Sequence, residues 1–463
     1  MSDSRVPASF RDPSGYLFVD EGEVHRQVNP SFRDAYELMM SSGFHADAVR
    51  QGLLIPHEEL SPQHFPGRAD AYKILLPEQI PFISYPYEWS FSQLQDAALL
   101  TLELQKLALE KNLCLRDASA FNVQFLRGRP IFIDSLSFEA YVEGRPWVGY
   151  QQFCRHFLAP LALMAHNHVE LRRLLRANID GIPLDVASAV LPGKTLLRFS
   201  LLTHVHLHAR AQRRHGDTRK SKEKANTSRI SRRGMLGLVD SLRSAVAQLT
   251  WDPAGTEWGA YYEDTNYSGR AQEHKKELVS RFLKRTTLRT VFDLGANTGL
   301  FSRLASDLGI HTVAFDVDAA AVEKNYRDCR KSEETHLLPL INDLTNPSPG
   351  LGWSGNERAS FFDRGPADGA MALALVHHLA IGNNVPLPHV AKMLRRTARR
   401  LIVEFVPKSD SQVQRLLATR EDIFPDYTQE GFEAAFAGDF NVLAREPVLD
   451  SDRVLYLMER REP

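Results

Sequence analysis

Residues 291–301, Val-Phe-Asp-Leu-Gly-Ala-Asn-Thr-Gly-Leu-Phe, combine an acid with a glycine-containing loop in a pattern that can bind a nucleotide. Gly295 and Gly299 follow a short apolar segment, where glycine lets the chain turn tightly and lets a ligand approach the backbone. Asp316 ends a second short apolar segment, and the spacing leaves room for one helix and one strand between the loop and this acid. An acid at such a position can accept both hydroxyls of a ribose. Loop, spacing and acid together predict a nucleotide-binding βαβ unit.

The loop differs from the loops that bind phosphates. It is neither Gly-x-Gly-x-x-Gly nor Gly-x-x-x-x-Gly-Lys-Ser/Thr. Asp293, just before the turn, would repel a pyrophosphate but could hold a cationic amino-acid ligand. The pattern Asp-x-Gly-x-x-x-Gly resembles motif I of the class I S-adenosylmethionine (SAM)-dependent methyltransferases. Asn297 stands where many members of that superfamily have a glycine, a variant that occurs within it.

The resemblance implies SAM as the cofactor and gives the matching positions their roles. The two loop glycines would bring the main chain close to the methionine part of SAM, with Asp293 beside its ammonium, directly or through water. Asp316 would accept the ribose hydroxyls, and Asp343 would face the adenine amino group. An Asx residue before Leu-Thr-Asn-Pro also makes turns, so a purely structural role for Asp343 stays open. The implied cofactor-binding residues are Asp293, Gly295, Asn297, Gly299, Asp316 and Asp343.

Two adjacent histidines, His377 and His378, follow the apolar segment 367–375. Ligands gather at the carboxyl ends of parallel strands, and adjacent side chains on an extended segment point opposite ways. We therefore expect one of the two histidines to line the pocket. It could act as a general base, or it could only wall the pocket while the enzyme aligns acceptor, methyl and sulfur. The methyl transfer that the resemblance implies would require no metal.

The elements that must position these residues alternate between strands and helices. Strands are predicted at 290–294, 311–316, 336–341, 367–375 and 400–406, with a closing hairpin at 440–447 and 453–459, and a first helix at 270–284. Such alternation predicts a parallel sheet with both faces covered. We predict an α/β fold with a seven-stranded, Rossmann-like sheet that is mostly parallel and ends in an antiparallel hairpin, similar to the methyltransferase arrangement. Val376-His-His-Leu and Glu404-Phe-Val-Pro-Lys-Ser-Asp look like the NoeA-type rhizobial nodulation methyltransferases.

The N-terminal half carries a second pattern. Asp117 and Asn122 follow a predicted helix at 94–111, and Asp134 ends Pro-Ile-Phe-Ile. This resembles the catalytic and metal-binding loops of kinase-like folds, where the first acid is a base and the other two residues hold Mg²⁺ with ATP. Residues 80–89 would then form a strand and a hinge. The alternative is a helix-to-strand junction with capping residues.

The kinase-like pattern departs from its family in three ways. Ser-Leu replaces Phe-Gly after Asp134, no glycine-rich loop is evident, and the strand 23–28 offers Arg26 in place of a lysine, with Lys73 as a substitute. We therefore predict a degenerate α+β kinase-like accessory domain, in which Mg²⁺ at Asn122 and Asp134, and ATP, bind only if the site is active.

The chain as a whole is close to neutral. Its 463 residues have a net charge of −1, and Cys114, Cys154 and Cys329 form no metal or disulfide pattern. We divide the chain into a kinase-like domain (1–205), a basic linker with a connecting helix that packs on the next domain (206–249), and a methyltransferase domain (250–463). Aromatic residues at 258–267 would form a lid or pack at the domain edge. With no signal peptide or apolar span, a cytoplasmic location is expected.

The sequence thus predicts a SAM-dependent methyltransferase that acts on a small-molecule or glycan-type acceptor. No nucleic-acid partner is expected, because the chain is neutral and its basic run (213–227) lacks aromatic residues for stacking bases. Two alternatives stay open: a bifunctional kinase-methyltransferase, and a non-catalytic binding or scaffold protein that retains both folds. The acceptor atom and the oligomeric state are not determined by the sequence.

Overall fold

The computed structural model describes residues 5–214, 229–253, 269–418 and 420–462, which belong to two compact units. The N-terminal unit comprises Met1–Asp252 together with Leu351–Arg358, and the C-terminal unit comprises Pro253–Gly350 and Ala359–Pro463. The aromatic segment 258–267 and most of the basic run 213–227 lie outside the described residues.

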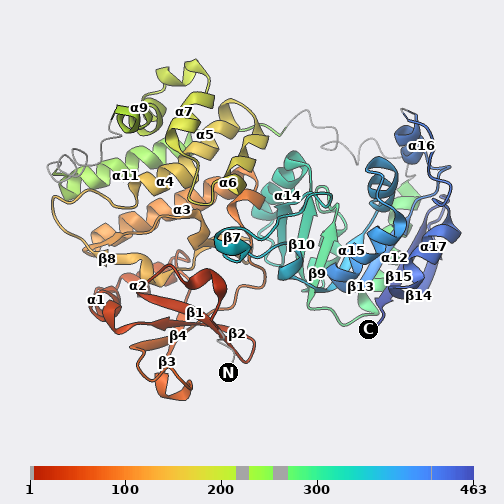
Figure 1. The fold of residues 1–463 in the computed structure, drawn as a ribbon, viewed down its shortest axis with the longest axis horizontal. Helices are drawn as coiled ribbons and strands as arrows, with labels where there is room; N and C mark the ends of the chain where they lie inside the picture. Colours follow the sequence, from red (N-terminus) through yellow and green to blue (C-terminus); the bar gives the residue numbers. More distant parts are fainter. Residues whose placement is uncertain (1–4, 215–228, 254–268, 419, 463) are drawn as a thin grey trace. The chain divides into compact units, whose positions relative to one another are not determined.

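The C-terminal unit is built around a seven-stranded sheet with the strand order β11-β10-β9-β12-β13-β15-β14 (Figure 1). Neighbours among β9 to β13 are parallel, whereas β15 runs antiparallel to both β13 and β14. The predicted α/β fold, a mostly parallel Rossmann-like sheet that ends in an antiparallel hairpin, is therefore confirmed. The strands are β9 (Thr290–Leu294), β10 (His311–Asp316), β11 (Leu337–Ile341), β12 (Ala367–Ala372), β13 (Ala398–Phe405), β14 (Phe440–Pro447) and β15 (Val454–Arg460).

Helix α12 covers one face of the sheet because it presents an apolar stripe to it. Leu278, Val279 and Phe282 of α12 are buried in one core cluster with residues of β9, β12, β13 and β15. Strand β12 ends three residues earlier than predicted, because Ala374 has a left-handed backbone (φ 50°) that breaks the extended segment. The helices are α12 (Gly269–Lys284), α13 (Ser302–Ser306), α14 (Ala319–Lys331), α15 (Leu387–Thr397), α16 (Ser411–Leu417) and α17 (Gln429–Ala437).

The N-terminal unit joins an antiparallel sheet to a mainly helical part (Figure 1). The sheet has the order β1-β2-β4-β3, formed by β1 (Gly15–Asp20), β2 (Glu23–Val28), β3 (His57–Leu60) and β4 (Lys73–Pro77), with α1 (Arg33–Ser41) and α2 (Phe44–Arg50) between β2 and β3. Two short antiparallel pairs follow, β5 (Leu113–Leu115) with β8 (Phe138–Ala140), and the hairpin of β6 (Val123–Leu126) with β7 (Arg129–Phe132).

Helix α3 (Phe91–Glu110) is the longest element of the helical part. Ser90 caps it by accepting a hydrogen bond from the backbone N–H of Gln93, whose side chain accepts in return. The predicted strand at 80–89 is wrong: two prolines, Pro81 and Pro86, interrupt the segment, and a single turn at Pro86–Glu88 precedes α3. The remaining helices are α4 (Tyr150–Phe153), α5 (Ala159–His166), α6 (Leu174–Ala177), α7 (Leu184–Val190), α8 (Phe199–Leu201), α9 (Leu207–Arg214) and α11 (Arg232–Ala247).

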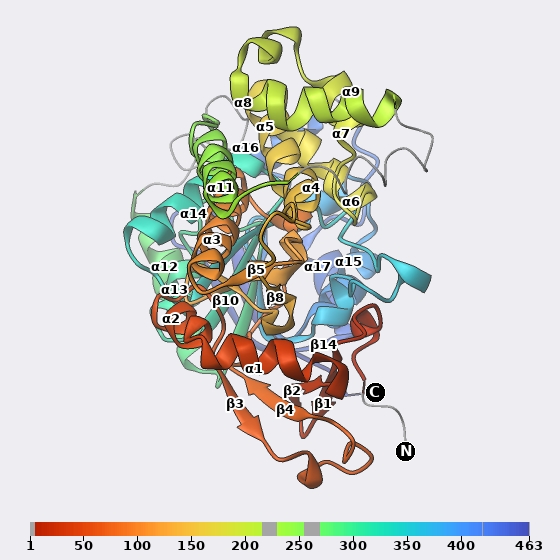
Figure 2. The same cartoon turned by 90° about the vertical axis from the view of Figure 1, so that its left-hand side faces the viewer.

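Helix α11 does not pack where the sequence led us to expect it. It lies along α3 within the N-terminal unit (Figure 2), and the side-chain amide of Gln95 donates to the carbonyls of Val246 and Leu249, each at 2.8 Å. Met235, Val239 and other residues at helical spacing are buried. The apolar face that we predicted is therefore real, but α3 is its partner.

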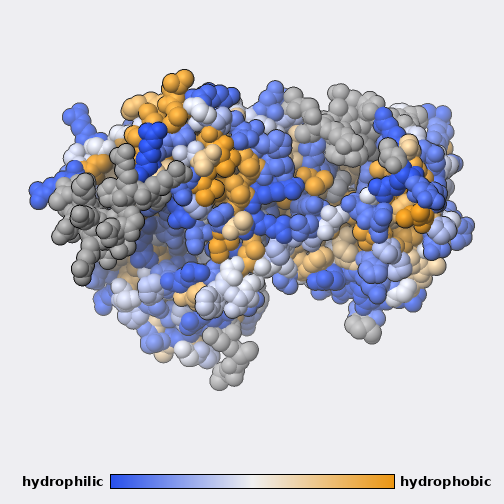
Figure 3. All heavy atoms as spheres, turned by 45° about the horizontal axis from the view of Figure 1, so that its top comes forward, coloured by the Kyte–Doolittle hydropathy of each residue, from blue (hydrophilic) through white to orange (hydrophobic). Residues whose placement is uncertain are grey.

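Among the helices of the described residues, none is long and apolar enough to cross a membrane. On the face drawn in Figure 3, hydrophilic side chains predominate and apolar ones form separate patches.

Candidate cofactor site

A cavity of about 370 Å³ lies at the carboxyl ends of β9, β10, β11 and β12. Each strand is followed by a segment of its wall, as expected for ligand sites in parallel sheets. The volume lies in the range of small-molecule pockets. The wall residues are Gln272, Lys275, Asp293, Gly295, Ala296, Asn297, Phe301, Asp316, Val317, Asn342, Asp343, Leu344, Thr345, Leu373, Ala374, Leu375, His378, Leu379 and Asn383.

The loop after β9 is shaped by residues with left-handed backbones. Gly295 (φ 78°) and Asn297 (φ 50°) both adopt this conformation and both line the cavity. The backbone N–H of Asn297 donates to Asp316 Oδ2 at 2.7 Å, and that of Asp318 donates to Oδ1 at 2.8 Å. Asp316 is therefore oriented at the cavity wall before any ligand binds. Burial raises the pKa of Asp316 to about 6.

Gly299 does not line the cavity, unlike Gly295. A Cβ atom at Gly299 would lie 2.5 Å from Asn325 Nδ2 and 2.7 Å from Arg303 Nη1, and its φ is 83°. Glycine at this position therefore serves the turn and its packing against α14 and α13. From the sequence alone, a glycine required by the turn could not be distinguished from a glycine required by contact with the cofactor.

The side chain of Asp293 is buried and lies at the wall of the cavity. It is 2% exposed, and the hydroxyl of Ser302 donates to its Oδ2 at 2.6 Å. Burial raises the pKa of Asp293 to about 7, and the charge of Asp316 acts in the same direction. A cationic ligand group would favour the charged form of this carboxylate.

Two polar residues after β11 complete the wall. Asn342 is 5% exposed, and its Nδ2 has no hydrogen-bond partner among the described residues. Asp343 Oδ1 accepts from the backbone N–H of Thr345 at 2.9 Å and from its hydroxyl at 2.6 Å. The turn that we considered as an alternative for Asp343 is thus present, and Asp343 also lines the cavity.

The two histidines have separate surroundings. His378 lines the cavity, whereas His377 is fully buried and neither of its ring nitrogens has a hydrogen-bond partner among the described residues. Burial lowers the pKa of His378 to about 4, with a smaller contribution from Arg453. His378 is therefore neutral near pH 7, the state in which an imidazole can accept a proton.

The sequence analysis did not predict the buried pair of charged residues beside the cavity: Lys275 was not considered, and Glu404 was named only as part of a family-like segment. Lys275 lies on the buried face of α12 and lines the cavity, and its Nζ is 2.7 Å from Glu404 Oε2 of β13. A signal existed for both. Lys275 falls on the apolar stripe that includes Leu278 and Val279, and Glu404 interrupts the apolar run 401–406 at the end of β13. Charged residues are rarely buried unless they are paired.

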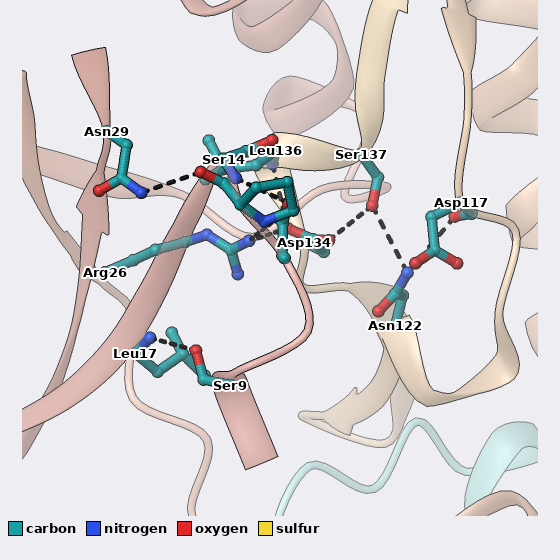
Figure 4. A network of polar contacts seen from close by, with 12 residues as sticks. Ser9, Ser14, Leu17, Arg26, Asn29, Asp117, Asn122, Asp134, Leu136 and Ser137 are labelled. Atoms are coloured by element: carbon teal, nitrogen blue, oxygen red, sulfur yellow. Dashed lines mark hydrogen bonds and ion pairs between the residues drawn. The ribbon is translucent and has the colours of Figure 1, made fainter. Parts of the chain in front are cut away.

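The predicted kinase-like residues come together in the N-terminal unit (Figure 4). The side-chain amide of Asn122 donates to the carbonyl of Asp117 at 3.3 Å and to Ser137 Oγ at 3.5 Å. The hydroxyl of Ser137 in turn donates to Asp134 Oδ2 at 2.6 Å. Burial, and secondarily the charge of Asp134, raise the pKa of Asp117. The cluster therefore joins three residues from two loops.

The donor set of this cluster does not suit a metal ion as it stands. Arg26 of β2 forms an ion pair with Asp134 Oδ1 at 2.7 Å (Figure 4), and the backbone N–H of Leu136 donates to the same oxygen at 3.1 Å. A guanidinium thus takes the place at the carboxylate that a cation would need. Lys73, the suggested substitute lysine, pairs with Glu59 of β3 instead.

Comparisons with known proteins give one full-length relative. No family model matches the chain. The solved structures that resemble part of it include magnesium protoporphyrin IX methyltransferase (ChlM) from Synechocystis PCC 6803 with bound SAH (TM-score 0.31, 15% identity, 44% of this chain and 93% of that one) and the N-methyltransferase NodS from Bradyrhizobium japonicum WM9 (TM-score 0.31, 10% identity, 42% and 99%).

The relative is nodulation protein NoeA of Rhizobium meliloti (strain 1021), which is 35% identical over 462 residues, 99% of this chain and 96% of that protein. Such similarity over nearly the full length of both proteins shows that the chain belongs to the NoeA family.

Proposed function

We propose that the C-terminal unit binds SAM and transfers its methyl group to a small-molecule or glycan-type acceptor. The observation that carries this proposal is the cavity at the ends of β9 to β12, whose wall contains Asp293, Gly295, Asp316 and Asp343 in the order that the methyltransferase resemblance requires. The neutral charge of the chain and the absence of aromatic residues in its basic run argue against a nucleic-acid acceptor.

The residues of the wall fit the chemistry of SAM. Asp316 would accept the ribose hydroxyls, because its oxygens are already oriented by two backbone N–H groups. Asp293 would hold the ammonium of the amino-acid end. The buried Nδ2 of Asn342, which has no partner among the described residues, suits an acceptor nitrogen of the adenine ring. Asp343 would accept from the adenine amino group.

When bound, SAM supplies a methyl group that is activated for transfer by its sulfonium. The residues around it would align the acceptor and exclude water, which by itself lowers the barrier. His378 is the histidine at the wall and is neutral near pH 7, but burial, which lowers its pKa to about 4, also makes it a weak base, so alignment of the acceptor would contribute more than proton transfer. His377 is fully buried, so we assign it no contact with the acceptor.

Binding of S-adenosylhomocysteine tests this function without knowledge of the acceptor. Calorimetry should give a dissociation constant on the order of micromolar. Asp316→Ala should weaken binding by about tenfold to a hundredfold, because it removes hydrogen bonds to a charged group. Asp307→Ala, at an exposed acid outside the cavity, serves as the control and should bind like the parent. Absence of binding by the parent protein at millimolar ligand would refute the proposal.

We also propose that the N-terminal unit is a kinase-like accessory domain that transfers no phosphate. The sheet order β1-β2-β4-β3 and the cluster of Asp117, Asn122 and Asp134 support the kinase-like assignment. The ion pair between Arg26 and Asp134 argues against a bound metal, and hence against a bifunctional kinase-methyltransferase.

This second proposal predicts that Mg²⁺ and ATP together leave the melting temperature of the full chain unchanged. The reason is that Arg26 neutralises the carboxylate that the metal would need. Differential scanning fluorimetry with ATP alone, Mg²⁺ alone and both would measure this. Asp134→Asn provides the comparison: it should lower the melting temperature by breaking the ion pair. A rise that requires both ATP and Mg²⁺, and that is lost in Asp134→Asn, would establish an active nucleotide site instead.

A further inference from the structure

The cavity wall contains charges of both signs at one end. Among the described wall residues, Lys275 is the only lysine or arginine. Its side chain is 3% exposed, and its ammonium lies 4.7 Å from the ring centroid of Phe301, another wall residue. Asp293 lines the same cavity and interacts electrostatically with Lys275. A cation and an anion are therefore both present at the end of the cavity near β9.

Glu404 holds the Lys275 side chain in place from the neighbouring part of the sheet. Glu404 is fully buried, and its Oε2 accepts a hydrogen bond from Lys275 Nζ at 2.7 Å. Its Oε1 lies 3.8 Å from Arg453, which itself pairs with Asp410 at 2.7 Å. A lysine anchored in this way loses little further freedom when it binds a ligand, which favours binding.

The same carboxylate also supports the cavity wall directly. The backbone N–H of Ala374, a wall residue, donates to Glu404 Oε2 at 2.7 Å. Ala374 has a left-handed backbone (φ 50°), which is costly for a residue other than glycine. Strain of this kind persists only where the surroundings enforce it, and here the buried carboxylate does so. Glu404 thus connects Lys275 and the wall residue Ala374 through hydrogen bonds to the same carboxylate oxygen.

We propose that Lys275, positioned by Glu404, binds the α-carboxylate at the amino-acid end of the cofactor. This inference rests on the proposed binding of SAM. An amino acid at neutral pH carries an ammonium and a carboxylate, and a site that recognises it needs a group of each sign. Asp293 meets the ammonium, and Lys275 is the wall residue whose charge suits the carboxylate. Burial lowers the pKa of Lys275, whereas Glu404 opposes that change, and a ligand carboxylate would oppose it further.

Three ligands separate carboxylate recognition from all other contributions to binding. S-adenosylhomocysteine carries the carboxylate, its α-carboxamide has the same shape without the charge, and 5′-methylthioadenosine lacks the whole amino-acid end. Lys275→Met keeps the length and apolar stem of the side chain but removes the ammonium. Lys276→Met is the matched control, because Lys276 is the next residue on α12 and pairs with Glu273, and it is not among the wall residues.

We expect Lys275→Met to weaken binding of S-adenosylhomocysteine by about tenfold to a hundredfold, the effect of losing a charge-assisted hydrogen bond. Binding of the carboxamide and of 5′-methylthioadenosine should change by less than about threefold, and Lys276→Met should bind all three ligands like the parent. Calorimetry on the full chain gives these constants. Because Lys275→Met removes the ammonium that pairs with the buried Glu404, the double variant Lys275→Met/Glu404→Gln is measured beside it and should show the same ligand preference.

The outcomes distinguish failure of this inference from failure of the proposed function. Equal losses for all three ligands would show that Lys275 has only a structural role, and an unchanged constant for S-adenosylhomocysteine would show that another group binds the carboxylate. Either result would overturn the inference while leaving SAM binding intact. A parent protein that binds none of the ligands would overturn the proposed function itself, and the inference with it.

Discussion

Replacing Glu404 by alanine should lower the free energy of unfolding of the C-terminal unit by about 3–5 kcal/mol, the usual cost of breaking a buried ion pair by removing one partner. Glu404 is fully buried, and the variant would leave Lys275 without its carboxylate and the N–H of Ala374 without an acceptor. The shared role of Glu404 explains the size of the expected effect. Urea unfolding followed by circular dichroism measures it.

Two comparisons make this stability prediction specific. Glu277→Ala removes an exposed glutamate from α12 and should change the free energy of unfolding by less than about 0.5 kcal/mol. Glu404→Ala combined with Lys275→Met should cost less than the sum of the two single variants, because the second change removes the charge that the first leaves buried. If Glu404→Ala were as mild as Glu277→Ala, the buried pair could not be an important support of the cavity wall.

The sequence predicted the scaffold of the site well because hydrophobic patterning reports directly on the sheet. All seven strands of the C-terminal sheet lie close to their predicted positions, and the loop after β9 begins where Gly295 requires it. The glycine and acid spacing was equally informative, since Asp293, Gly295, Asn297, Asp316 and Asp343 all line one cavity. These features depend on local order along the chain, which a single sequence displays.

The features that the sequence did not reveal depend on contacts between distant elements. Lys275 and Glu404 are 129 positions apart, and only the parallel sheet brings α12 against β13. Gly299 has a pattern typical of a cofactor contact, yet the space around it is filled by Asn325 of α14. In the N-terminal unit, the sequence showed that strand 23–28 contains Arg26 in place of a lysine. It could not show that Arg26 forms an ion pair with Asp134, because the two residues are brought together only by the fold.

The affinity for S-adenosylhomocysteine should fall by about a thousandfold when the pH is lowered from 7.5 to 5, about a hundredfold through Asp293 and about tenfold through Asp316. Burial raises the pKa of Asp293 to about 7 and that of Asp316 to about 6, so both carboxylates become protonated over this range. A ligand ammonium at Asp293 and ribose hydroxyls at Asp316 favour the charged carboxylates, and each group loses about tenfold in affinity per pH unit below its pKa. Calorimetry at several pH values tests this, and Asp293→Asn should bind weakly with a shallower pH dependence.

The stability of the ligand-free protein should respond to these two acids in the opposite direction. Their folded pKa values lie above the ordinary value of 3.8, so the folded state binds protons more readily than the unfolded state does. Their contribution to stability is therefore fully present below about pH 3.8 and is lost as the pH rises through about 6 and 7. Buried histidines with lowered pKa values, such as His377 and His378, act against this stabilisation as the pH falls, so the melting temperature of the ligand-free protein is measured at each pH beside the affinity. An affinity that stays constant over this range would show that neither carboxylate meets the ligand in its charged form.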